Sequence, residues 1–162
     1  MTTKERPIDW LPADKDDVER AQALAARPPE ELVPVLPQLI RWLRYDGYPV
    51  AAPVAGRLRA VGALAVPTVR YVLRGHDAVL KRNVIRDVVS AWPAEDVAAV
   101  LIELGQLMSD SQSWGADLEA LGVLIRHSLI DKDVASQWIA FKRARYREFS
   151  TQLEEIARML DE

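Results

Sequence analysis

Apolar residues recur at intervals of three and four along most of the chain, a spacing that is typical of amphipathic helices. Val50, Val54, Leu58 and Val61 are one example. No segment alternates apolar and polar residues between the Asn-Gly or Asp-Gly turns that mark β-hairpins. The pattern therefore predicts an all-α fold.

Two closely spaced prolines, Pro49 and Pro53, interrupt that spacing in the segment WLRYDGYPVAAPVAGRLRAVG. Gly47 is expected to end the preceding helix, because glycine is common just after a helix. A helix leaves its first N–H groups without intrahelical partners, so the missing N–H of a proline costs little there. The two prolines therefore predict the entry of a helix that runs to Gly62.

Other local signals set further expected boundaries. Pro34 and Pro37 lie inside a helical pattern that begins at Pro29, and they predict an early kink or restart. Aspartates that precede apolar runs predict helix N-caps at Asp14, Asp77, and Asp131 or Asp133. The helix after Asp77 is expected to run to Trp92, and the next one from 94 to 108.

The expected helix starts, near residues 30, 50, 65, 78, 94 and 115, pair into units of roughly 30–40 residues. Such units must stack to bury their apolar faces. A last long helix is expected over residues 131–162, with a stripe that includes Val134, Phe141, Leu153 and Ile156. We expect one domain over residues 1–162, with an N-terminal extension (1–13) and this long helix as a C-terminal cap.

The segment LPADKDDVERAQALAARPPEELVPVLPQLIRWLRYDGYPVAAPVAGRL, residues 11–58, resembles a family of small bacterial HEAT-like domains of unknown function. The resemblance implies a short right-handed stack of antiparallel helix pairs, a short α-solenoid. It implies no reaction, so its matching residues serve only as markers of the fold: Leu11, Pro12, Trp42, Pro49 and Pro53. It fades to general helical spacing after Gly62.

Charge is distributed unevenly along the 162 residues, whose net charge is −3. Residues 41–90 hold nine basic and three acidic side chains, whereas residues 91–141 hold two and eight. Two solvated faces that neutralise each other would explain this, and so would a charged surface that steers a partner of opposite sign. Cysteine is absent, which removes disulfides, thiol nucleophiles and cysteine-based zinc sites. A cytoplasmic location is expected.

No pattern of reactive residues emerges. The two histidines, His76 and His127, are expected in a turn and near a helix end. Carboxylates such as Glu30 and Glu31 are adjacent in sequence, so on a helix they point about 100° apart and do not share a proton or a metal ion. The phosphate-loop, nucleophile-elbow and zinc-protease motifs are missing from the sequence. We expect no catalytic residue, cofactor or metal, and a non-enzymatic protein.

The candidate interaction surface combines aromatic and basic residues. Trp10 and Trp114 lie at expected helix entries, where they could pack between helices or remain partly exposed, while Tyr45 and Tyr48 flank the Asp46-Gly47 turn. Aromatic side chains at such exposed places are suitable interface anchors. The basic candidates fall on two successive hairpins: Arg70, Arg74, Lys81, Arg82 and Arg86. Trp42, Trp92 and Trp138 follow apolar stripes and are expected in the core.

Two functions fit these features. The first is a protein-binding module, for example a small immunity or adaptor protein, that acts as a monomer or weak homo-oligomer without a membrane. The alternative is a nucleic-acid-binding domain, similar to HEAT-like DNA-repair proteins, that uses the basic 41–90 segment. The acidic net charge favours a protein partner, because nucleic-acid-binding domains are usually strongly basic.

Overall fold

The computed structural model describes residues 9–110 and 112–162. Every regular element in these ranges is a helix or a 3₁₀ turn, which confirms the all-α prediction. Most of the expected N-terminal extension, residues 1–8, lies outside the described part. No helix in the described ranges combines the length and the apolar character needed to cross a membrane.

The helices are short, and most are joined by a few residues. Their bounds are α1 Val18–Ala23, α2 Pro29–Leu32, α3 Leu36–Leu39, α4 Ala51–Val61, α5 Val66–Arg74, α6 Ala78–Asp87, α7 Ala94–Ala98, α8 Leu101–Met108, α9 Ala116–Arg126, α10 Lys132–Arg145 and α11 Ser150–Arg158. The 3₁₀ turns are η1 Leu24–Ala26, η2 Val33–Val35, η3 Ile40–Arg44, η4 Gly62–Ala65, η5 Val89–Ala91 and η6 Arg147–Phe149.

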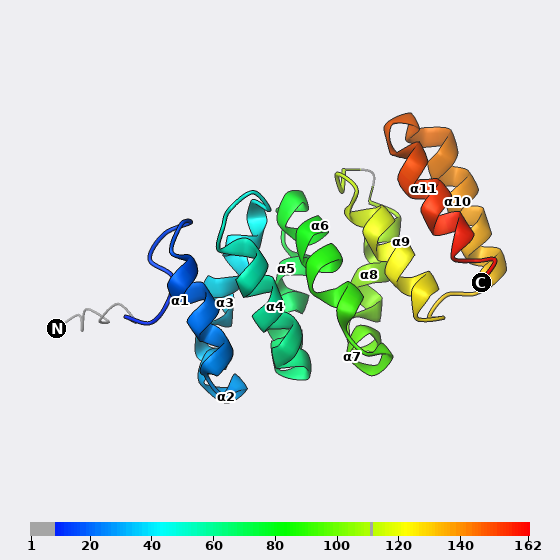
Figure 1. Cartoon of the computed structure of the whole chain (residues 1–162). Coiled ribbons are helices and arrows are strands. Elements are labelled where there is room, and N and C mark those ends of the chain that lie inside the picture. Colours follow the sequence, from blue (N-terminus) through cyan, green and yellow to red (C-terminus); the bar gives the residue numbers. More distant parts are fainter. Residues whose placement is uncertain (1–8, 111) are drawn as a thin grey trace.

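Figure 1 shows these helices in a row that follows the sequence, with the N-terminus at one end and the C-terminal helices at the other. One layer contains α4, α6 and α9, which contact one another in that order. The second layer contains α3 with η3, then α5 and α8, and α5 contacts α8. Contacts across the layers join η3 to α4 and α6, and α8 to α9.

The proline signals are confirmed. Helix α4 begins at Ala51, so Pro49 precedes it and Pro53 lies in its first turn. The stretch from Pro29 to Arg44 is divided into four short helical pieces, with Pro34 in η2 and Pro37 in α3. Proline removes an N–H donor, which explains why no long regular helix forms there.

Aspartate caps begin three of the helices, with one correction. Asp77 accepts a hydrogen bond from the N–H of Leu80, and Asp131 accepts from Asp133, as predicted. The prediction of Asp14 as the first cap is wrong, because Asp17 caps α1 and Asp14 accepts from Asp16 in the preceding turn.

Two expected helices are shorter than the sequence suggested. Helix α6 ends at Asp87 instead of continuing to Trp92, and η5 follows. The stretch expected as one helix from 94 to 108 is divided into α7 and α8 at Val100 (φ −114°, ψ 17°). Both interruptions keep apolar side chains inside, since Val88, Trp92 and Val100 are buried.

Buried positions recur with a spacing of 30 residues between two successive helix pairs, α3 with α4 and α5 with α6. The pairs of buried residues are Leu36 and Val66, Leu39 and Val69, Leu43 and Leu73, Val50 and Leu80, Val54 and Val84, and Leu58 and Val88. In the third pair, α8 with α9, the spacing changes. It is 31 residues for α8, where Leu104 corresponds to Leu73, and 37 residues for α9, where Leu121 corresponds to Val84. The third pair therefore carries extra residues between α8 and α9.

The expected single helix over residues 131–162 is wrong. The chain leaves the helix at Tyr146, and α11 folds back on α10. A straight helix of this length would extend about 48 Å, far beyond α9. The reversal instead brings both helices onto α9 and buries Leu153 and Ile156.

One of the three tryptophans expected in the core is fully buried. Trp92 is buried, at 2% exposure, while Trp42 and Trp138 are half-buried and contact the core cluster. That cluster runs without a break from Ala21 in α1 to Ile156 in α11.

Candidate functional site

A groove of about 360 Å³ lies between α3 with η3 on one side and α5 with the start of α6 on the other. Its walls are mostly apolar and include two prolines at corresponding positions, Pro37 and Pro67. Tyr71 of α5 lines the groove and is 80% exposed. Exposed aromatic side chains over an apolar groove are typical of binding surfaces.

A second groove, of about 340 Å³, adjoins the first and shares Arg41 with it. Its aromatic wall consists of Trp42, Tyr45 and Tyr48, with the ring centroids of the two tyrosines 5.0 Å apart. Leu11 and Pro12 also line this groove. The structure therefore brings the candidates Tyr45 and Tyr48 together on one side of Arg41.

Three exposed side chains mark the outer face of the second layer. Arg41, Tyr71 and Ile102 occupy corresponding positions of η3, α5 and α8, at spacings of 30 and 31 residues. Tyr71 and Ile102 are 80% and 70% exposed, although the next residue in each helix, Val72 or Glu103, is buried. We refer to these three residues as the exposed row.

The sequence interpretation missed Arg41 and Tyr71 as site residues. A signal for Tyr71 was present, because Val66, Val69 and Leu73 define the buried face of α5 and leave Tyr71 on the opposite side. The signal for Arg41 was weaker. Its place between the two grooves depends on how α3 and η3 pack beside α5.

Two of the predicted basic residues, Arg70 and Arg74, converge on one buried carboxylate. Glu103 of α8 is 3% exposed, and its Oε1 lies 2.7 Å from Nη2 of Arg74 and 3.4 Å from Nε of Arg70. Arg70 also donates to the main-chain carbonyl of Ala99. These two arginines join α5 to the next helix pair.

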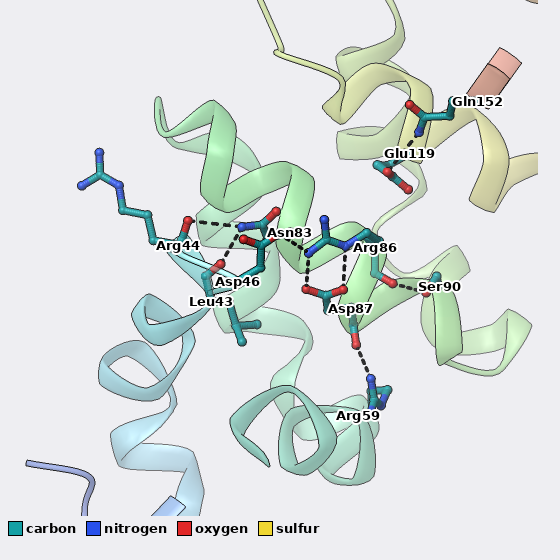
Figure 2. Close-up of polar contacts among 10 residues, drawn as sticks. All are labelled: Leu43, Arg44, Asp46, Arg59, Asn83, Arg86, Asp87, Ser90, Glu119 and Gln152. Atoms are coloured by element: carbon teal, nitrogen blue, oxygen red, sulfur yellow. Dashed lines mark hydrogen bonds and ion pairs between the residues drawn. The ribbon is translucent and has the colours of Figure 1, made fainter. Parts of the chain in front are cut away.

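Arg86 is similarly engaged, as Figure 2 shows. Its Nε lies 2.7 Å from Oδ1 of Asp87, and Nη2 lies 3.4 Å from Oδ2 of Asp46. The hydrogen bond to Asp87 raises the pKa of Arg86 above its ordinary value. Arg86 therefore links α6 to the turn before α4.

Other side chains bond to main-chain carbonyls of neighbouring pairs. Asn83, buried in α6, donates to the carbonyls of Leu43 (2.8 Å) and Arg44 (3.2 Å). Arg59 donates to the carbonyl of Asp87 over 2.8 Å, and Arg57 donates to that of Arg27. Because helix ends leave carbonyls without intrahelical partners, these bonds satisfy groups that would otherwise need water.

The remaining basic candidates do not join the exposed row. Lys81 is buried at 8% exposure, so it offers little surface to a partner. Arg82 is half-buried, and its Cδ lies close to Gly115, where a Cβ atom would be 3.4 Å away. Trp10 packs against the core, with the guanidinium carbon of Arg27 4.0 Å from its ring centroid.

Trp114 lies in the extra residues between α8 and α9, and it is 74% exposed. Its φ is +51°, a left-handed conformation that bulky residues rarely adopt. The flanking positions hold it there, because Ser113 is buried and bonds to Asp117, while Gly115 also has positive φ, +91°. The exposure of the Trp114 side chain agrees with the prediction. The strained backbone at this residue was not predicted from the sequence.

A buried ion pair lies directly beneath this turn. Lys142 of α10 is 1% exposed, and its ammonium group donates to a carboxylate oxygen of Asp117 and to the carbonyl of Met108 over 2.7 Å. The second carboxylate oxygen of Asp117 accepts from Ser113 over 2.6 Å. The ion pair therefore ties α10 to α8, α9 and the turn that carries Trp114.

Three aromatic rings surround the same ammonium group. The nitrogen lies 5.5 Å from the ring centroids of Trp138 and Tyr146, and 5.8 Å from that of Phe141. Such rings stabilise a cation through their negative faces. The cage is filled by the chain's own lysine, so it is a structural centre and not a binding pocket.

Burial raises the pKa of Glu119 in α9 above its ordinary value. Arg86 acts in the opposite direction, and so does the hydrogen bond that Gln152 of α11 donates over 3.0 Å. Glu119 lies away from both grooves, in the contact between α9 and α11.

Together these features define an all-helical protein with two adjoining grooves on one layer of its helices. Residues 10–121 match DUF5071, a domain of unknown function, and the chain belongs to this family. The match includes both grooves, whereas α10 and α11 lie beyond it. No curated protein matches the chain.

Proposed function

We propose that this protein is a non-enzymatic protein-binding module, built as a short HEAT-like α-solenoid that the α10–α11 hairpin caps. The layered order of the helices and the 30-residue recurrence of buried positions support the architecture. In this proposal, residues 9–162 act as one cytoplasmic domain, as a monomer or weak homo-oligomer.

The exposed row carries the functional part of the proposal. A soluble helix normally turns charged residues outward, yet α5 and α8 present Tyr71 and Ile102 there. The two grooves beside Arg41 add apolar walls to this face. Large apolar side chains beside a cation are typical of protein-binding surfaces. An immunity or adaptor protein that covers a site on its partner would use such a surface.

Affinity capture from the native lysate, followed by titration of the purified partner, tests this function. We expect one protein to bind the wild type, and Tyr71→Ala to weaken binding at least tenfold because it removes a central aromatic contact. Phe141→Ala is the matched control, since Phe141 is an exposed aromatic residue of α10 outside the row. Failure to recover a partner, or equal binding by both variants, contradicts the proposal.

A further inference from the structure

Among the described residues that line the two grooves, Arg41 carries the one permanent charge without a partner. The other ionisable side chains that line them are Asp77 and His76. Asp77 is neutralised by Arg44, whose Nε lies 3.0 Å from Oδ2. Within residues 9–110 and 112–162, Arg41 has neither an ion pair nor a side-chain hydrogen bond, and it is exposed. The grooves therefore present a positive group between apolar walls.

The apolar walls lie on both sides of Arg41. One groove offers Pro37, Ile40, Pro67, Tyr71, Val72 and Leu80. The other offers Leu11, Pro12, Trp42, Tyr45 and Tyr48. Volumes of about 340 and 360 Å³ are each sufficient for large side chains, since ligand pockets commonly measure roughly 300–1,000 Å³.

The length of the face favours an extended ligand. Packed helices lie about 8–10 Å apart, so the two grooves, one on either side of η3, together span roughly 20 Å. An extended chain covers about 3.3 Å per residue, and six residues match this length. Such a chain would cross the helices and place alternate side chains into the grooves.

We propose that the grooves bind an extended acidic segment of a protein partner, with a carboxylate on Arg41 and large apolar side chains in the grooves on either side. This inference rests on the proposed function and specifies the chemistry of its partner. Charge complementarity selects the carboxylate. The aromatic and proline walls select the flanking side chains, because a large apolar side chain buries most surface against rings and prolines.

The same features disfavour a phosphate backbone as the occupant. Nucleic-acid binding draws its affinity from many phosphate contacts, but these grooves offer a single uncommitted arginine. Arg70, Arg74 and Arg86 are held in ion pairs within the protein. A segment with one or two carboxylates matches the available charge better than a polyanion does.

Selection of random 12-residue peptides displayed on phage tests the inference with the full-length protein. We expect the selected peptides to share an Asp or Glu next to large apolar residues. Synthetic versions should bind the Arg41→Glu variant at least tenfold more weakly. Arg143→Glu, which reverses an exposed arginine of α10, is the matched control and should bind as the wild type does. Both arginines are exposed, so circular dichroism should show unchanged folds.

The possible results separate the two proposals. If the selected peptides bind through Tyr71 but contain no acidic residue, the proposed acidic specificity is wrong, whereas the proposed protein-binding function still holds. Selection that yields no peptide dependent on Tyr71 or Arg41 also overturns the inference, whereas the lysate capture decides the proposed function independently. Binding of a 20-base-pair duplex that Arg41→Glu abolishes would replace the peptide with nucleic acid and contradict the inference.

Discussion

The ammonium group of Lys142 is a charge buried in the protein interior, and its partners explain how it is tolerated there. Replacing Lys142 with Met leaves the carboxylate of Asp117 buried without its counter-ion. Breaking one side of a buried ion pair costs about 3–5 kcal/mol, so we expect a loss of that size in urea denaturation. Lys132→Met, at an exposed position of the same helix, is the control and should change little.

The double variant Lys142→Met with Asp117→Leu separates charge from packing. Apolar replacement of both members of a buried pair is often neutral, so it should recover most of the stability lost in the single variant. An equal loss in both variants would mean that packing, and not the unpaired carboxylate, dominates the cost.

Backbone strain at Trp114 leads to an unusual expectation. Its side chain is 74% exposed, so little burial is lost on replacement, and Asn tolerates positive φ better than Trp does. We therefore expect Trp114→Asn to raise the free energy of unfolding by about 0.5–1 kcal/mol. Ser128, also at positive φ (+54°), offers a parallel case, and Ser128→Asn should change stability in the same direction. Destabilisation by Trp114→Asn would show that the ring makes a stabilising contact.

Burial of Glu119 predicts a pH effect on stability. Its folded pKa is raised, so the folded state holds the proton more tightly than the unfolded chain. Stability should fall as pH rises from the ordinary carboxyl range through the raised pKa, and it should stay lower at neutral pH. Glu119→Gln removes the cost of burying a charged carboxylate, and its side-chain oxygen still accepts the hydrogen bond from Gln152. The variant should be more stable than the wild type at about pH 7 and equally stable near pH 4, as measured by thermal unfolding. Glu148→Gln, at an exposed site, should show no such crossover.

At the scale of elements, boundaries set by local chemistry were predictable. Proline at Pro49 and Pro53, and aspartate at Asp77 and Asp131, act within a few residues of their own position, so the sequence is enough. The C-terminal hairpin was not predictable in this way. The segment around Tyr146 contains neither glycine nor proline, and its reversal depends on covering α9.

The hairpin distinguishes two residues that the sequence placed on one stripe. Phe141 is 51% exposed, whereas Leu153 is fully buried. We expect Leu153→Ala to cost about 2–5 kcal/mol because it leaves a cavity, and Phe141→Ala to cost less than about 1 kcal/mol. Denaturant titration of the two variants measures the difference. Equal losses would contradict the hairpin and favour a single long helix.

At the scale of the molecule, the candidate site was only partly predictable. Tyr45 and Tyr48 flank a turn that the sequence marks, and the structure places them on one groove wall. The basic residues were interpreted as a surface because residues 41–90 contain so many of them. Their partners, such as Glu103 for Arg70 and the carbonyl of Asp87 for Arg59, lie about 30 residues away and depend on how neighbouring helices pack. Local patterns carry no information on that alignment.

These internal partners lead to the last prediction, which concerns nucleic acid. A phosphate backbone would have to displace Glu103 from Arg74 and Asp87 from Arg86 before it could bind there, and the acidic 91–141 segment adjoins them. We therefore expect no binding of a fluorescein-labelled 20-base-pair duplex at about 50 mM salt, where electrostatic binding is strong. Fluorescence anisotropy measures this directly. Binding that fades steeply with salt, and that is lost in the Arg82→Ala plus Arg86→Ala variant, would contradict this expectation and restore the nucleic-acid alternative. The Arg143→Ala variant controls for a general loss of positive charge. If it weakened duplex binding equally, the attraction would be non-specific and would not depend on Arg82 and Arg86.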